Sequence, residues 1–204
     1  MATLTNTKIK DTYDGLLKTT DNDVIGASEK VITDGLGNAS VLSIGTGSAS
    51  FSSDIEVNGL TIGLGSGDIV TNTALGLDAL LANTSGSGNV SVGQGSLRTN
   101  TTGIGNVAVG KDALRNNTTG VHNVSVGAIS LFNNTTGGNN VAIGKEAMYL
   151  NTTGYANIAI GTSALYDNTT GLRNNAIGID ALGNNTEGDD NIALGAYALQ
   201  DNTT

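Results

Sequence analysis

Apolar and polar positions recur every 17 residues over most of this chain. A glycine that closes an apolar stretch marks each repeat, and it occurs at Gly76, Gly93, Gly110, Gly127, Gly144, Gly161, Gly178 and Gly195. A second glycine column and an asparagine column stay in phase, giving the consensus Asn-Thr-Thr-Gly-x-x-Asn-Val-Ala-Val-Gly-x-x-Ala-Leu-x-x. Such a fixed-length repeat predicts a stacked array in which each unit is one coil. Neighbouring coils then bury the apolar surface that one coil cannot bury alone.

Within each repeat, two bulky apolar residues flank a small one, as in Val107-Ala108-Val109. A period of two residues places the bulky pair on one face of a short strand and the small residue on the other. The small column includes Ala108, Ser125, Ala142 and Ala159, and the bulky column includes Val109, Val126, Ile143 and Ile160. A strand face restricted to small side chains implies that another part of the protein packs closely against it. We therefore predict that neighbouring chains meet at this face. The bulky column is then the candidate interior.

A second apolar column follows each marker glycine by four residues and comprises Leu80, Leu97, Leu114, Leu131, Met148, Leu165, Leu182 and Leu199. Each repeat is therefore expected to contain two short strands and two glycine corners. The in-phase asparagines, such as Asn100 and Asn117, can form ladders whose amides hydrogen-bond along the axis. Each coil of 17 residues offers only three or four medium-sized apolar side chains. Their burial does not offset the conformational entropy that the coil loses on folding. Lateral association would add burial, so we predict an oligomer, with a trimer as the first choice.

One polar residue breaks the bulky pattern. Asn175 stands where its column otherwise holds Val or Ile, apart from Thr73 in the first repeat. If that column is interior, the amide needs partners or destabilises its coil. We therefore predict that Asn175→Val raises the melting temperature.

The segment before the array carries different patterns. Between residues 8 and 18, the spacing of Ile9, Tyr13, Leu16 and Leu17 predicts a short helix with one apolar face. That face needs a partner, which could be the chain's own body, a symmetry copy or another protein.

Two pairs of short β-type runs follow this predicted helix. Residues 30–33 and 40–44 flank a linker of turn residues, and residues 54–57 and 60–62 flank Asn58-Gly59. The predicted organisation is an attachment segment at 1–29, a β-rich entry region at 30–70 and eight repeats at 71–204. The predicted fold class is all-β, a parallel β-solenoid or β-roll.

Composition and charge argue against several functional classes. The net charge of −9 disfavours nucleic acid as a partner, because phosphate binding needs clustered Lys and Arg. The chain has no cysteine and one histidine, His122, which we interpret as a surface loop residue. The acidic stretch Glu187-Gly188-Asp189-Asp190 is read as a solvated corner, with a shared cation site as the alternative. We therefore expect no enzyme activity, no metal and no cofactor.

The repeats resemble two known families. Asn140-Val141-Ala142-Ile143-Gly144 is similar to the head repeat of trimeric autotransporter adhesins, which implies a parallel β-roll assembled as a trimer. The longer unit with Asn-Thr-Thr-Gly and Ala-Leu more closely resembles repeats of bacteriophage tail fibres, often followed by a C-terminal self-cleaving chaperone domain. Residues 58–204 carry this resemblance, and residues 8–20 and 32–35 are similar to N-terminal segments of such fibres.

The resemblance implies a virion protein, made in the host cytoplasm, whose repeats form a trimeric shaft. Its N-terminus would bind another tail or capsid protein, with Ile9, Tyr13, Leu16 and Leu17 as docking candidates. A receptor-binding tip is expected beyond Thr204, because the pattern stops within a repeat. The first residues lack a signal-peptide pattern and no apolar run is long enough to span a membrane, so no membrane insertion is expected.

Two further interpretations of the repeats remain open. A trimeric adhesin on a bacterial cell surface is the main alternative, in which the repeats bind host surfaces. An ice-binding solenoid is a weaker one, based on the threonine columns that include Thr118 and Thr119.

Overall fold

The computed structural model describes residues 18–19, 30–33, 39–44, 49–51, 55–57, 60–67 and 69–204, with side chains from residue 62 onward. The chain divides into two compact units, residues 1–54 and 55–204. The predicted helix and its apolar residues Ile9, Tyr13, Leu16 and Leu17 lie outside the described residues. Lys18, the last residue of that prediction, is the first residue of a strand.

The first unit contains a four-stranded antiparallel sheet in sequence order. Its strands are β1 (Lys18–Thr19), β2 (Lys30–Thr33), β3 (Ala39–Ile44) and β4 (Ala49–Phe51). The antiparallel pairing of β2 with β3 confirms the first predicted pair of strands.

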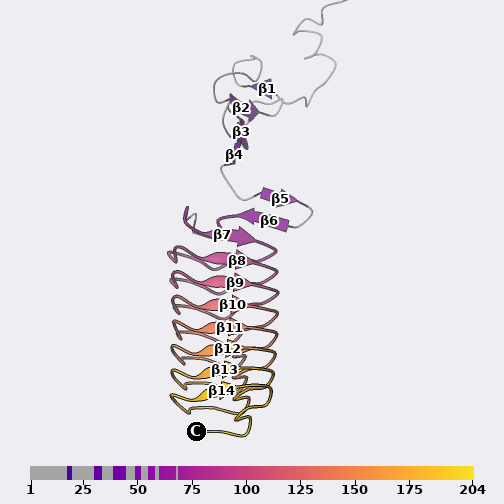
Figure 1. Ribbon diagram of the computed structural model, residues 1–204. Coiled ribbons are helices and arrows are strands. Elements are labelled where there is room, and N and C mark those ends of the chain that lie inside the picture. Colours follow the sequence, from indigo (N-terminus) through magenta and orange to yellow (C-terminus); the bar gives the residue numbers. More distant parts are fainter. Residues whose placement is uncertain are drawn as a thin grey trace, which may run out of the picture. The chain divides into compact units, whose positions relative to one another are not determined.

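The second unit begins with the other predicted pair and continues into the repeats. Strands β5 (Ile55–Val57) and β6 (Leu60–Gly63) are antiparallel, and β6 is antiparallel to β7 (Thr73–Leu75). From β7 onward all pairings are parallel (Figure 1). The further strands are β8 (Val90–Val92), β9 (Val107–Val109), β10 (Val124–Val126), β11 (Val141–Ile143), β12 (Ile158–Ile160), β13 (Asn175–Ile177) and β14 (Ile192–Leu194).

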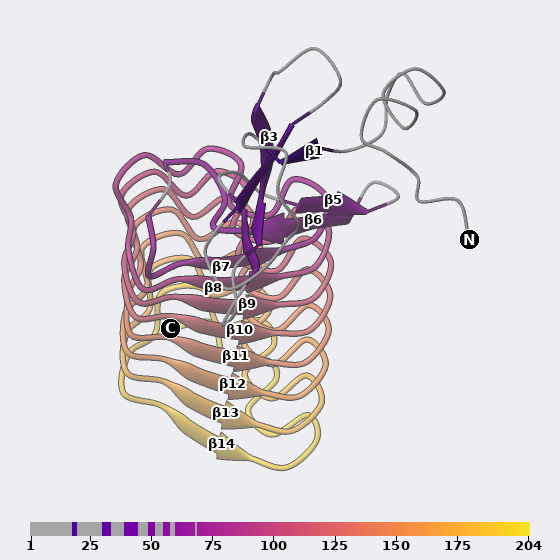
Figure 2. The ribbon, with the colours of Figure 1, turned by 90° about the horizontal axis from the view of Figure 1, so that it is seen from above.

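Each strand pairs with the residues one repeat away, so one sequence repeat forms one coil. Val107, for example, pairs with Val124, and Ala108 pairs with Ser125. The coils lie above one another in a regular stack (Figure 2). The prediction of a parallel β-solenoid of 17-residue coils is therefore confirmed.

Each coil contains one strand, whereas the sequence suggested two. The second apolar column lies in a turn, and its residues have left-handed backbones, with φ of 46° at Leu97 and 51° at Leu114. Positive φ interrupts an extended chain, which is why no second strand forms. The turn still bonds to the next coil, because the Leu97 amide donates to the Ala113 carbonyl at 3.1 Å and the Leu114 amide to the Ser130 carbonyl at 2.9 Å.

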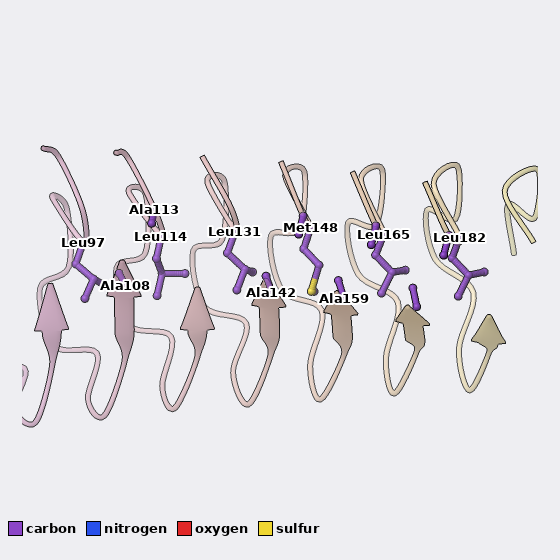
Figure 3. Packing of buried hydrophobic residues seen from close by; sticks show 14 of the residues in the cluster. Leu97, Ala108, Ala113, Leu114, Leu131, Ala142, Met148, Ala159, Leu165 and Leu182 are labelled. Carbon is purple, nitrogen blue, oxygen red and sulfur yellow. The ribbon is translucent and has the colours of Figure 1, made fainter. Parts of the chain in front are cut away.

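The core lies between the strand layer and this turn. The second apolar column, called the Leu column below, projects from the turn toward the small residues of the strands, as Leu114 and Ala108 illustrate (Figure 3). Both side chains are fully buried, as are Ser125, Ala142 and Ala159. The small column therefore faces the interior of its own coil and not a neighbouring chain, which corrects the predicted meeting place. Only small residues fit there because the leucines fill the remaining space.

Serines in the core occur in pairs. Where the strand carries Ser91 or Ser125, the turn five residues later carries Ser96 or Ser130, and the other repeats carry alanine at both positions. The Ser91 hydroxyl donates to the Ser96 carbonyl at 2.9 Å and also contacts the Ser96 hydroxyl. A buried hydroxyl needs a hydrogen-bond partner, and the second serine supplies one.

Candidate functional site

The outward face of the strands is a continuous uncharged strip. It comprises the two bulky columns of β7–β14, none of whose residues carries a charge. The exposed fraction is 36% at Val109, 39% at Ile143 and 67% at Leu194, in the last coil. Val126 is partly buried, and Ile160 is 37% exposed. The bulky column is therefore a surface feature, which corrects its placement as candidate interior. An apolar strip of this length on an array is typical of an interaction surface.

Two ladders of asparagine amides run along the buried side of the coils. In the first ladder, the Asn134 Nδ2 donates to Asn117 Oδ1 at 2.8 Å and to the Gly137 carbonyl at 3.0 Å. In the second, the Asn123 Nδ2 donates to Asn106 Oδ1 at 3.2 Å and to the same Gly137 carbonyl at 2.8 Å. The predicted ladders are confirmed, and in the part of the chain with described side chains no buried polar side-chain atom lacks a partner.

The Asn-Thr-Thr-Gly segment forms a corner of the coil. The hydroxyl of the first threonine forms a hydrogen bond to the next coil. Thr118 Oγ1, for example, donates to the Thr135 carbonyl at 3.0 Å. Only the second threonine, such as Thr119, is exposed. The two threonines therefore do not share one flat face, as an ice-binding surface would require.

A row of aromatic rings lies on the turn layer. Phe132 and Tyr149 stack with centroids 5.4 Å apart, and Tyr149 and Tyr166 stack at 5.2 Å. The Arg115 guanidinium lies 5.9 Å from the centroid of Phe132 and extends the row on one side. These residues directly follow the Leu column, so they belong to the layer opposite the strands.

Two open grooves of about 210 Å³ lie on the turn layer. One contains ion pairs, with Arg98 Nε 3.2 Å from Asp78 Oδ2 and Arg115 Nη1 2.8 Å from Asp112 Oδ1. Both arginines that line this groove are therefore already paired with carboxylates. The other groove borders Tyr166, at the end of the aromatic row.

The acidic corner near the C-terminus is paired with an arginine. Arg173 Nε lies 2.6 Å from Asp190 Oδ1, and its Nη2 lies 3.8 Å from Asp189 Oδ2. The hydrogen bond from Arg173 lowers the pKa of Asp190. Within the described residues, no group of three or more His, Asp or Glu side chains could hold a metal ion. His122 is exposed in a loop, as predicted.

No protein-family model, curated protein or solved structure matches this chain. Over the residues that the structure describes, no helix is long and apolar enough to cross a membrane.

Proposed function

We propose that this chain forms the homotrimeric shaft of a bacteriophage tail fibre or a related virion appendage. The observation that carries the proposal is a straight stack of eight parallel strands with an uncharged apolar strip along one face. The N-terminal segment would attach the shaft to another virion protein. The shaft would hold a receptor-binding tip away from the particle, so its role is mechanical.

A second and a third copy of the same chain fit this strip best. The strip repeats with the period of the coil, so two copies aligned in parallel match apolar rows that only Thr73 and Asn175 interrupt. The interior of each coil is already filled by the Leu and Ala columns, so the strip is not needed for the chain's own core. Burial of partly exposed residues such as Val109 and Ile143 would stabilise the assembly through the hydrophobic effect.

The asparagine ladders suit a load-bearing rod. Neighbouring coils are joined by the backbone hydrogen bonds of the strands and by two further amide bonds, for example those donated by Asn117 and Asn123. Force along the axis is then shared by several hydrogen bonds per coil. The resemblance to tail-fibre repeats supports the same function.

The first test is the mass of the intact chain by sedimentation equilibrium. A trimer has three times 20.4 kDa, or 61.2 kDa. Val126→Lys combined with Ile143→Lys should shift the mass toward 20.4 kDa, because it places charges in the strip. The control is Thr136→Lys, on an exposed corner, which should leave the mass unchanged. A monomeric native chain would overturn the trimer.

The second test locates the protein in its source. Gold-labelled antibodies against the folded repeats should mark appendages on purified phage particles in electron micrographs. Labelling of bacterial cells in the absence of particles would instead support the cell-surface adhesin.

A further inference from the structure

The aromatic row stops where a glycine replaces a large side chain. The row's column contains Leu81, Arg98, Arg115, Phe132, Tyr149, Tyr166, Gly183 and Gln200. One ring face of Tyr166 stacks on Tyr149. The position that would cover its other face, in the next coil, is Gly183. One member of the stack is therefore missing.

The backbone does not require glycine at this position. Gly183 has no positive φ, unlike the corner glycines, and a Cβ there would lie 3.2 Å from the Asp180 carbonyl oxygen and 3.6 Å from Gln200 Cγ. The equivalent positions in other coils hold arginine, phenylalanine or tyrosine on the same backbone. The glycine thus leaves a space that a larger residue could occupy.

This space is the second groove on the turn layer. Its walls include Tyr166, Gly183 and Gln200, which occupy the same column in three successive coils. The remaining lining is polar and comes from Ser163, Asp167, Asp180 and Asn184. No Lys or Arg side chain lines it. The Asn184 amide donates to Asp201 Oδ1 at 3.3 Å, which restrains its orientation.

We propose that this groove binds the pyranose ring of an uncharged sugar. The ring would replace the missing member of the stack, with its C–H face against Tyr166. Coils in a β-stack are about 4.8 Å apart, so one absent side chain leaves roughly the thickness of a saturated six-membered ring. The ligand requires no change in the backbone.

The polar lining fits hydroxyl groups. The Asp167 and Asp180 carboxylates can accept hydrogen bonds from sugar hydroxyls, and the Gln200 amide can donate to a hydroxyl oxygen. Burial, followed by the charges of Glu146, Tyr149 and Asp167, raises the pKa of the Tyr166 phenol further above neutral pH, so this group can donate a hydrogen bond. Two carboxylates with no Lys or Arg in the lining disfavour acidic sugars.

The groove lies on the layer opposite the strands, so it stays open when the apolar strip is covered. The inference does not depend on the trimer, because one chain supplies the whole lining. If it holds, the shaft itself contacts glycans, in addition to any tip.

The test is a titration of the native chain with methyl α-glucopyranoside, methyl α-galactopyranoside and methyl α-mannopyranoside, followed by saturation-transfer NMR. Saturable transfer to the ring protons of at least one glycoside is expected. Gly183→Tyr should extend the aromatic row and fill the groove, and Tyr166→Ala should remove the wall. Loss of one stacking contact should weaken binding by about tenfold.

The matched control is Tyr155→Ala, which removes an exposed tyrosine that does not line the groove. Its binding should equal that of the native chain. Circular dichroism of Gly183→Tyr should show an intact fold, and persistent binding by this folded variant would overturn the proposed location. No saturable binding of any of the three glycosides would overturn the inference. Tighter binding of methyl glucuronide would overturn the preference for uncharged sugars.

Discussion

At the scale of single residues, the glycines in this array have two different roles. Gly93 has a φ of 129°, and a Cβ there would lie 2.5 Å from the Gly110 carbonyl oxygen of the next coil. Gly88 has a φ of 65°, and the nearest atom would be 3.9 Å away. In another coil, Ala156 occupies the position of Gly88 with a φ of 57°. One glycine is therefore required by contact with the next coil, and the other is replaceable.

These contacts predict unequal effects of the same substitution. Gly93→Ala should lower the free energy of unfolding by about 3 kcal/mol or more, because the backbone of two coils must separate. Gly88→Ala should lower it by about 1 kcal/mol or less, since alanine is accepted at this φ in the same fold. Urea denaturation of both variants measures the difference. Equal losses would show that the close contact with the next coil does not fix the marker glycine.

At the scale of the strand, the outward face determines how Asn175 behaves. Asn175 is partly buried on β13 and pairs with Ile158 on one side and Ile192 on the other. Asn175→Val should raise the melting temperature, because an apolar cross-strand pair stabilises a sheet by about 0.2–1 kcal/mol. Thr153→Val, on an exposed corner, serves as the control and should have little effect. Calorimetry showing an unchanged or lower value for Asn175→Val would contradict the prediction.

The repeat pattern was sufficient to predict the one strand that each coil contains, the coil length and the asparagine ladders, but it wrongly suggested a second strand at the Leu column. It did not reveal which strand face is interior. Val and Ile are more apolar than Ala, so hydropathy favours the bulky column as the core. Leu114 and its equivalents nevertheless fill the coil and leave room only for Ala108 or Ser125. The left-handed leucines could not be predicted, because residues other than Gly, Asn and Asp rarely adopt positive φ.

Two signals in the sequence carried more information than its hydropathy did. Ser91 with Ser96, and Ser125 with Ser130, change together between repeats, and a pair that covaries at a spacing of five residues indicates contact across the coil. The second signal is Gly183, a glycine in a column that elsewhere carries large side chains. This exception marks the point where the aromatic row stops, beside the groove.

At the scale of the whole molecule, the array should tolerate the loss of one complete coil. Deleting residues 128–144 joins Gly127 to Lys145 and keeps every column in phase. Because stability in such arrays is roughly a sum over repeats and their interfaces, this variant should fold and melt at a modestly lower temperature. Deleting residues 128–143 shifts the phase by one residue and should abolish cooperative unfolding. Circular dichroism during thermal melting compares the two, and similar curves would show that phase is unimportant.

The direction of the amide bonds has a consequence for the shaft as a physical object. Every Asn in the first ladder donates toward the preceding coil, from Asn100 to Asn83 through to Asn202 to Asn185. The amide–amide bonds of the second ladder point the same way. Aligned amides add their dipoles, as peptide groups do in a helix. The two ladders therefore share one polarity, which distinguishes the first coil of the array from the last. In chains that associate in parallel, this polarity would run in the same direction in every chain.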